Sequence, residues 1–189
     1  MLTSAIGLLV LAASATHIEP RTGISFPDKQ SGGTLSRLGV RTKGPIKVYA
    51  VGEYESGAYM LKMSYSVGAA KMASALADAL KPRCSDAALI DDFEACLLKG
   101  LPNGAPKGTK LVFSTSGGKL GVAVNDKHIG SIGSKKLCKA FASIYTDRNA
   151  VCAMHPIGDE PSTPSGCSTP VRGALIGAGV GYGLGKLFS

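Results

Sequence analysis

Residues 45–54 alternate between two faces with a period of two, which is the repeat of a β-strand and excludes a helix there. The members of the two faces are Ile46, Val48, Ala50 and Tyr54 on one side and Lys47, Tyr49, Val51 and Glu53 on the other. Because Tyr49 and Val51 are apolar, the second face is not purely solvated. The segment therefore predicts a strand with packing on both faces.

The remaining periodic segments follow in the order strands, two helices, strands, helix. We expect strands at 22–27, 58–67, 110–115, 119–125 and 128–132, a loop at 28–34, and helices at 68–80, from residue 85 to residue 100, and from residue 134 onward. Ser85 and Ser134 are the expected N-caps of the second and third helices. This grouping predicts an α+β fold in which helices cover one face of an antiparallel sheet.

Both ends of the chain differ in composition from the part between them. Residues 1–15 contain an apolar run followed by small residues, which is typical of a cleavable targeting peptide and predicts the secretory pathway or an organelle lumen. The first residues lack Lys and Arg, so an uncleaved apolar start or a plastid-type leader stays open. The globular domain is expected at 17–155, followed by a Pro/Ser/Thr linker at 156–171.

The last segment, residues 172–189, is an apolar tail with glycines four residues apart, at Gly173, Gly177, Gly181 and Gly185. Such spacing lines one face of a helix and favours membrane contact or self-association through residues 173–185. Thirteen residues at ~1.5 Å each are shorter than the ~30 Å hydrocarbon core, so a single span is not indicated. A flexible tail is the other interpretation.

Charge and motifs exclude several function classes. The net charge is +8, but the basic residues are scattered and no nucleic-acid motif accompanies them, so no nucleic-acid partner is predicted. The five cysteines have no CxxC spacing, and no hydrolase, zinc-protease or phosphate-loop motif occurs. We therefore predict no metal and no cofactor. The expectation for Cys96 and Cys138 is that both are free thiols on apolar helical faces.

Arg41 is the side chain with the clearest chemical meaning. Arg41 lies in a segment that is expected to form a constrained turn, at Gly39 and then at Gly44-Pro45. This turn places Arg41 beside the alternating strand at 45–54. A permanent cation next to apolar surface is costly unless an anion meets it. Together with Tyr49, Arg41 suits an apolar molecule with an anionic or phenolic head. The competing interpretation is a solvated arginine at a strand end.

An ordered set of short segments resembles the chalcone isomerase family. These segments are 19–27 (EPRTGISFP), 38–41 (LGVR), 47–54 (KVYAVGEY), 99–102 (KGLP), 107–109 (KGT), 130–132 (GSI) and 137–145 (LCKAFASIY). The resemblance covers about residues 17–154 and implies the open-faced β-sandwich of that family.

The resemblance implies two functions. In the catalytic branch, an intramolecular lyase adds a phenoxide to an enone, with an arginine on the phenoxide; in the other branch the same arginine meets the carboxylate of a fatty acid. Arg41 matches that arginine, Tyr49 stands where the isomerases carry a threonine, and Ile144 falls near a position that sets substrate preference.

Residues 81–84 run directly into the next helix, where the isomerases insert a lysine, a tyrosine and an asparagine. The sequence therefore predicts a protein that holds a fatty acid or similar anionic lipophile on Arg41, Tyr49 and Ile144. The alternative is an isomerase with Arg41 and Tyr49 as catalytic residues.

Overall fold

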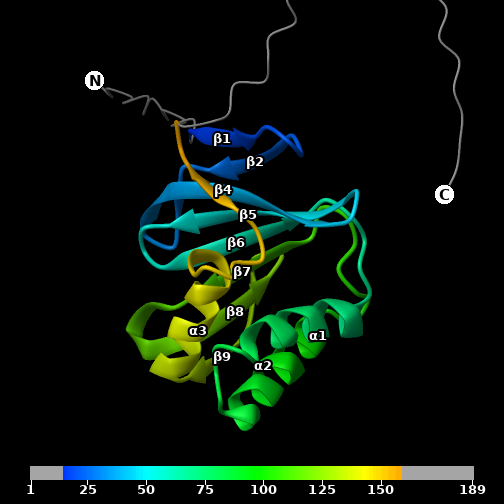
Figure 1. Ribbon diagram of the computed structural model, residues 1–189, viewed down its shortest axis with the longest axis vertical. Coiled ribbons are helices and arrows are strands. Elements are labelled where there is room, and N and C mark those ends of the chain that lie inside the picture. Colours follow the sequence, from blue (N-terminus) through cyan, green and yellow to red (C-terminus); the bar gives the residue numbers. More distant parts are fainter. Residues whose placement is uncertain (1–14, 159–189) are drawn as a thin grey trace, which may run out of the picture.

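The computed structural model describes residues 15–158, which form an antiparallel sheet with helices on one face (Figure 1). The strands are β1 (Thr16–Glu19), β2 (Ile24–Pro27), β3 (Lys29–Gln30), β4 (Gly33–Lys43), β5 (Ile46–Tyr54), β6 (Ala58–Met63), β7 (Lys110–Ser114), β8 (Lys119–Val124), β9 (Lys127–Gly133) and β10 (Met154–Pro156). The helices are α1 (Ala69–Leu80), α2 (Ala87–Gly100) and α3 (Lys135–Thr146), with a short 3-10 turn η1 (Ser116–Gly118).

The main sheet is eight-stranded and has the order β10-β4-β5-β6-β7-β8-β9, with β3 paired to β4. Every neighbouring pair is antiparallel. From β4 to β9 the strands follow the chain in order, and α1 and α2 are inserted between β6 and β7. β1 and β2 form a separate two-stranded ribbon. The predicted fold class, an α+β open-faced sandwich, is confirmed.

The core between the sheet and the helices is rich in aromatic rings. Tyr59, Phe93, Phe113, Phe141 and Tyr145 come from both layers, and their ring centroids lie 4.6–6.0 Å apart. All five side chains are buried. Edge-to-face and stacked aromatic pairs at these distances add to the stabilisation from area burial alone. The helix face of the sheet is therefore filled by side chains of the protein itself.

The opposite face of β4, β5 and β6 carries a second apolar core. The fully buried ring of Phe26 from β2 packs here with Leu35, Ala50 and Tyr54. A Cβ added to Gly52 would lie 2.9 Å from both Leu35 Cδ1 and Phe26 Cδ1, so glycine is needed for this close approach. Both faces of β5 are thus packed, as its alternation predicts.

Capping residues that can be recognised in the sequence mark where α2 and α3 begin. Ser134 accepts a hydrogen bond from Leu137 N and caps α3, as predicted. The cap of α2 is Asp86, which accepts from Leu89 N, and the expectation for Ser85 was wrong. Both residue types are good N-caps, and Asp86 adds a negative charge at the positive end of the helix dipole.

Three further expectations need correction. Gly39 is not a turn residue; it lies within β4, where a Cβ would come 2.6 Å from both Ala153 O and Met154 Sδ. Residues 28–34 are not all loop, because Lys29 and Gln30 pair with β4 across a turn at Ser31 and Gly32, both with positive φ. The strand expected at 58–67 ends at Met63. Gly44, at φ +57, is a turn residue as expected.

Within residues 15–158, no helix has the length and apolar character needed to cross a membrane. The predicted targeting segment 1–15, linker 156–171 and glycine-rich tail 172–189 lie outside the described residues, except at their borders, and stay predictions.

Candidate ligand-binding site at Arg41 and Tyr49

The strand register brings Arg41 and Tyr49 together. Arg41 of β4 lies directly opposite Tyr49 of β5, and Tyr49 lies opposite Met63 of β6. Directly opposed residues in an antiparallel pair project from the same face of the sheet. Because Tyr49 and Met63 belong to the core under the helices, Arg41 stands on the helix face at its margin. Arg41 itself is half-buried.

The backbone of Val151 connects Arg41 with the third predicted residue, Ile144. Arg41 Nη1 donates a hydrogen bond to Val151 O at 2.6 Å, and Val151 N donates to Ile144 O at 2.9 Å. Ile144 is fully buried on α3. The structure therefore places all three predicted residues at the junction of the sheet, the end of α3 and the segment that follows α3.

Tyr49 forms a buried pair of phenols with Tyr145. Its hydroxyl lies 3.4 Å from that of Tyr145, and the Tyr145 ring stacks on Tyr59 with centroids 5.3 Å apart. Tyr59 in turn donates to Glu53 Oε1 at 3.0 Å, and Glu53 Oε2 accepts from Arg37 Nε. The sequence indicated Tyr145 only as a core residue of the third helix. Its pairing with Tyr49 spans 96 residues and has no local signal.

The phenols and the thiol beside Arg41 are neutral at physiological pH. Burial raises the pKa of Tyr49 well above its ordinary value, against a smaller lowering by the hydrogen bond to Tyr145. The pKa of Tyr145 is also raised by burial and by its neighbour Tyr49. Cys152 lies nearby, and burial raises the pKa of its thiol to about 11, with the positive charges of Arg41 and Arg21 acting in the opposite direction. The phenols and the thiol are therefore neutral near pH 7.

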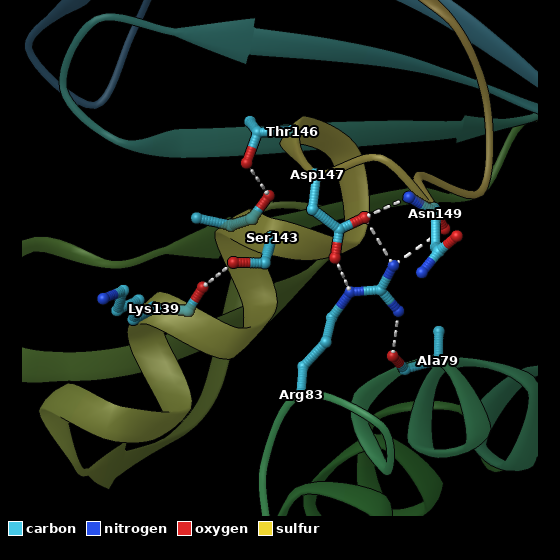
Figure 2. Close-up of polar contacts among 8 residues, drawn as sticks. Ala79, Arg83, Lys139, Ser143, Thr146, Asp147 and Asn149 are labelled. Atoms are coloured by element: carbon cyan, nitrogen blue, oxygen red, sulfur yellow. Dashed lines mark hydrogen bonds and ion pairs between the residues drawn. The ribbon is translucent and has the colours of Figure 1, made fainter.

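A polar cluster around Arg83 holds the segment after α3 in place (Figure 2). Arg83 donates to both carboxylate oxygens of Asp147, from Nε at 2.7 Å and Nη2 at 2.8 Å. It also donates to Asn149 O at 2.7 Å and to Ala79 O at 2.6 Å. The arginine follows the end of α1, and Asp147 caps the end of α3. This clamp thus fixes the turn from which the chain continues to Val151.

Two hollows on the described surface lie away from the three predicted residues. A groove of about 540 Å³ runs between α2 and β9, and a hollow of about 230 Å³ lies near Asp126 and His128. Neither is lined by Arg41, Tyr49 or Ile144. At Arg41 itself, the carbonyl of Val151 accepts a hydrogen bond from one nitrogen of the guanidinium.

Comparison with solved structures identifies the same fold in a plant protein. A fatty-acid binding protein of Arabidopsis thaliana superposes with a TM-score of 0.63 over 72% of this chain and 94% of that chain, at 20% sequence identity. No protein-family model and no curated protein sequence matches the chain. At this identity the likeness shows the fold, and it agrees with the chalcone-isomerase-like sandwich expected from the sequence. The site roles and the isomerase alternative stay predictions.

Proposed function

We propose that this protein binds a fatty acid or a similar anionic lipophile, with Arg41 as the anchor of the acidic head. The supporting observation is the place of Arg41, a half-buried cation at the edge of an apolar core and directly opposite the buried Tyr49. The fold shared with a fatty-acid binding protein supports the same ligand class.

The guanidinium of Arg41 has N–H donors available for a ligand. Among residues 15–158 its one hydrogen bond is that from Nη1 to Val151 O, so the remaining N–H groups are left for a carboxylate. A carboxylate accepts two parallel hydrogen bonds from arginine, and such charge-assisted bonds are the strongest of their kind in proteins. Tyr49 is neutral at physiological pH and adds no repulsion toward an anion.

The lipophilic part of the ligand needs space beside Arg41, and the proposal places that space where Val151 now contacts the guanidinium. When Val151 leaves Arg41, the ligand head replaces its carbonyl, and the apolar side chains of Val48 and Met63 beside Tyr49 become the first surface for the alkyl chain. The proposal therefore couples binding to a movement of residues 150–153, while the hydrogen bonds of Arg83 to Asp147 and Asn149 stay in place.

The test is binding of palmitate to the full chain, followed by native mass spectrometry and by displacement of a fluorescent fatty acid. Arg41→Gln is expected to weaken palmitate binding at least about tenfold, because a charge-assisted pair is lost. Lys43→Gln is the matched control, since it removes one exposed positive charge from the end of the same strand. Equal palmitate affinity of wild type and Arg41→Gln would overturn the anchor role of Arg41.

Hexadecanol has the alkyl chain of palmitate without its carboxylate, so it separates the contribution of the acidic head from that of the alkyl chain. Wild type should prefer palmitate to hexadecanol, and Arg41→Gln should lose that preference. A preference for palmitate that survives in Arg41→Gln would place the acidic head on another cation.

A further inference from the structure

Four connecting segments meet at the end of the sheet where β5 begins, on the right-hand side of Figure 1. They are the β1–β2 turn at 20–23, the β4–β5 hairpin at 43–47, the loop 64–68 before α1 and the loop 101–109 before β7. We call the surface formed by these four segments the hairpin end.

Hydrogen bonds join the four segments to one another. Lys47 donates to the carbonyl oxygen of Arg21, which connects the hairpin with the β1–β2 turn. Tyr65 N donates to Val48 O at 3.1 Å, which connects the loop before α1 with the start of β5. Lys107 N in turn donates to Ser66 Oγ at 3.0 Å. The hairpin end is therefore one continuous surface.

The charge of the hairpin end is positive. Its four segments contain no Asp or Glu, whereas Arg21, Lys43, Lys47 and Lys107 are all exposed. Within residues 15–158 none of these four cations takes part in an ion pair.

The neighbouring carboxylates are already engaged. Glu19 is buried and accepts hydrogen bonds from the backbone N–H groups of Arg21 and Thr22. Asp126, in the turn between β8 and β9, pairs with Lys110 at 2.5 Å. The exposed cations of the hairpin end are therefore available to an anionic partner.

Exposed apolar side chains stand among these cations. Ile46 is 41% exposed and Tyr65 is 52% exposed, and they are two of the four large hydrophobic side chains that are exposed within residues 15–158. Ile46 lies directly opposite Lys43 in the hairpin, so both project from the same face. Tyrosine and lysine both place an apolar body beside lipid while the polar tip stays in water. Apolar side chains ringed by cations suit the headgroup region of an anionic bilayer.

We propose that this protein docks on anionic lipid membranes through the hairpin end. Ile46 and Tyr65 enter the headgroup region, and the ammonium groups of Lys43, Lys47 and Lys107 meet the lipid phosphates. A nucleic acid would engage the cations but would leave Ile46 in water, so the combination favours the membrane. Arg41 lies two residues before Lys43 on β4, which places the membrane beside the proposed fatty-acid anchor. The docking itself does not depend on fatty-acid binding.

Cosedimentation of the full chain with vesicles tests the docking. Wild type should bind phosphatidylcholine vesicles containing about 30% phosphatidylglycerol more tightly than pure phosphatidylcholine vesicles. Lys43→Gln/Lys107→Gln should weaken binding to the anionic vesicles about tenfold or more, with no change on the neutral ones. Ile46→Ser/Tyr65→Ser should weaken binding to both vesicles about tenfold, because the buried apolar area is lost.

Two controls accompany these variants. Lys136→Gln/Lys139→Gln removes two exposed lysines from α3, which begins after β9 at the opposite end of the sheet, and should bind both vesicles as wild type does. Arg41→Gln should also bind vesicles within about threefold of wild type, since Arg41 is half-buried behind the exposed cations. Failure of the proposed fatty-acid binding is thus separable from failure of the docking.

A fluorescent reporter locates the contact. The chain contains no tryptophan, so Ile46→Trp supplies a single one. Its emission should shift to shorter wavelength on the anionic vesicles and be quenched by brominated lipid. Ala88→Trp, in the exposed first turn of α2, is the matched control and should show neither effect.

Three results would overturn the proposal. The first is wild type that does not bind the anionic vesicles. The second is bound protein in which the Ile46→Trp reporter is neither shifted nor quenched, which would place the contact in another segment such as 173–185. The third is binding to duplex DNA without binding to vesicles, which would assign the cations to a nucleic acid.

Discussion

Nη1 of Arg41 lies 2.6 Å from the carbonyl oxygen of Val151, a residue 110 positions further along the chain. This contact joins β4 to the segment that follows α3. The conformation of the proposed anchor therefore depends on residues 147–153 and, through them, on the Arg83 clamp. The stability of this segment and the proposed ligand binding should therefore be linked at this junction.

Loss of the clamp should loosen that segment. Arg83→Ala removes the two hydrogen bonds to Asp147 and those to two carbonyl oxygens, from a side chain that is only 9% exposed. We expect the unfolding midpoint to fall by about 5 °C or more and amide exchange in 147–153 to rise about tenfold. Lys81→Ala, which breaks an exposed ion pair with Asp78, is the control and should change neither. Unchanged exchange in Arg83→Ala would contradict the clamp.

The phenol pair should behave as a coupled unit. Tyr49→Phe leaves the buried hydroxyl of Tyr145 without its partner, and the reverse holds for Tyr145→Phe. Each single variant should lose about 1–2 kcal/mol of unfolding free energy, whereas the double variant should lose clearly less than the sum. Urea denaturation of the four proteins measures this coupling. Strict additivity would show that the two hydroxyls do not interact.

Cys152 should make the protein less stable in base. Its thiol pKa is raised from 9.0 to about 11 by burial. Between these values the unfolded chain loses the proton while the folded chain keeps it, so unfolding becomes easier as the pH rises. From pH 8 to pH 10, wild type should lose about 1 kcal/mol more than Cys152→Ala. Denaturant titrations at both pH values measure this, and parallel losses in the two proteins would contradict it.

Gly39 should tolerate no side chain. In Gly39→Ala the new Cβ meets the backbone oxygen of Ala153 at 2.6 Å, so β10 must shift away from β4. We expect a loss of about 1–3 kcal/mol of unfolding free energy. Gly133→Ala, where nothing lies within 4 Å of the added Cβ, is the matched strand control. Equal stability of the two variants would show that β10 adjusts freely.

Long periodic segments could be predicted well from the sequence. In β5 the buried side chains recur every two residues, and in α1 they recur every three to four residues. Each repeat identifies the type of element. Gly39 and residues 28–34 were misjudged because glycine marks both turns and close contacts, and because the short pairing of β3 carries no apolar pattern. Neighbouring capping residues, such as Ser85 and Asp86, are equivalent in a sequence argument.

Local periodicity and side-chain chemistry determined the order of β5 to β9 and of the three helices, the packing on both faces of β5, and Arg41 as the cation of interest. They did not identify the strand β4 that carries Arg41, nor its partner β10. Only the tertiary structure decided what surrounds Arg41. The register that opposes it to Tyr49, the Val151 carbonyl that it binds, and the aromatic rings filling the core all join residues distant in the chain. Such contacts arise from packing of whole layers against one another, and no neighbouring residue in the sequence records them.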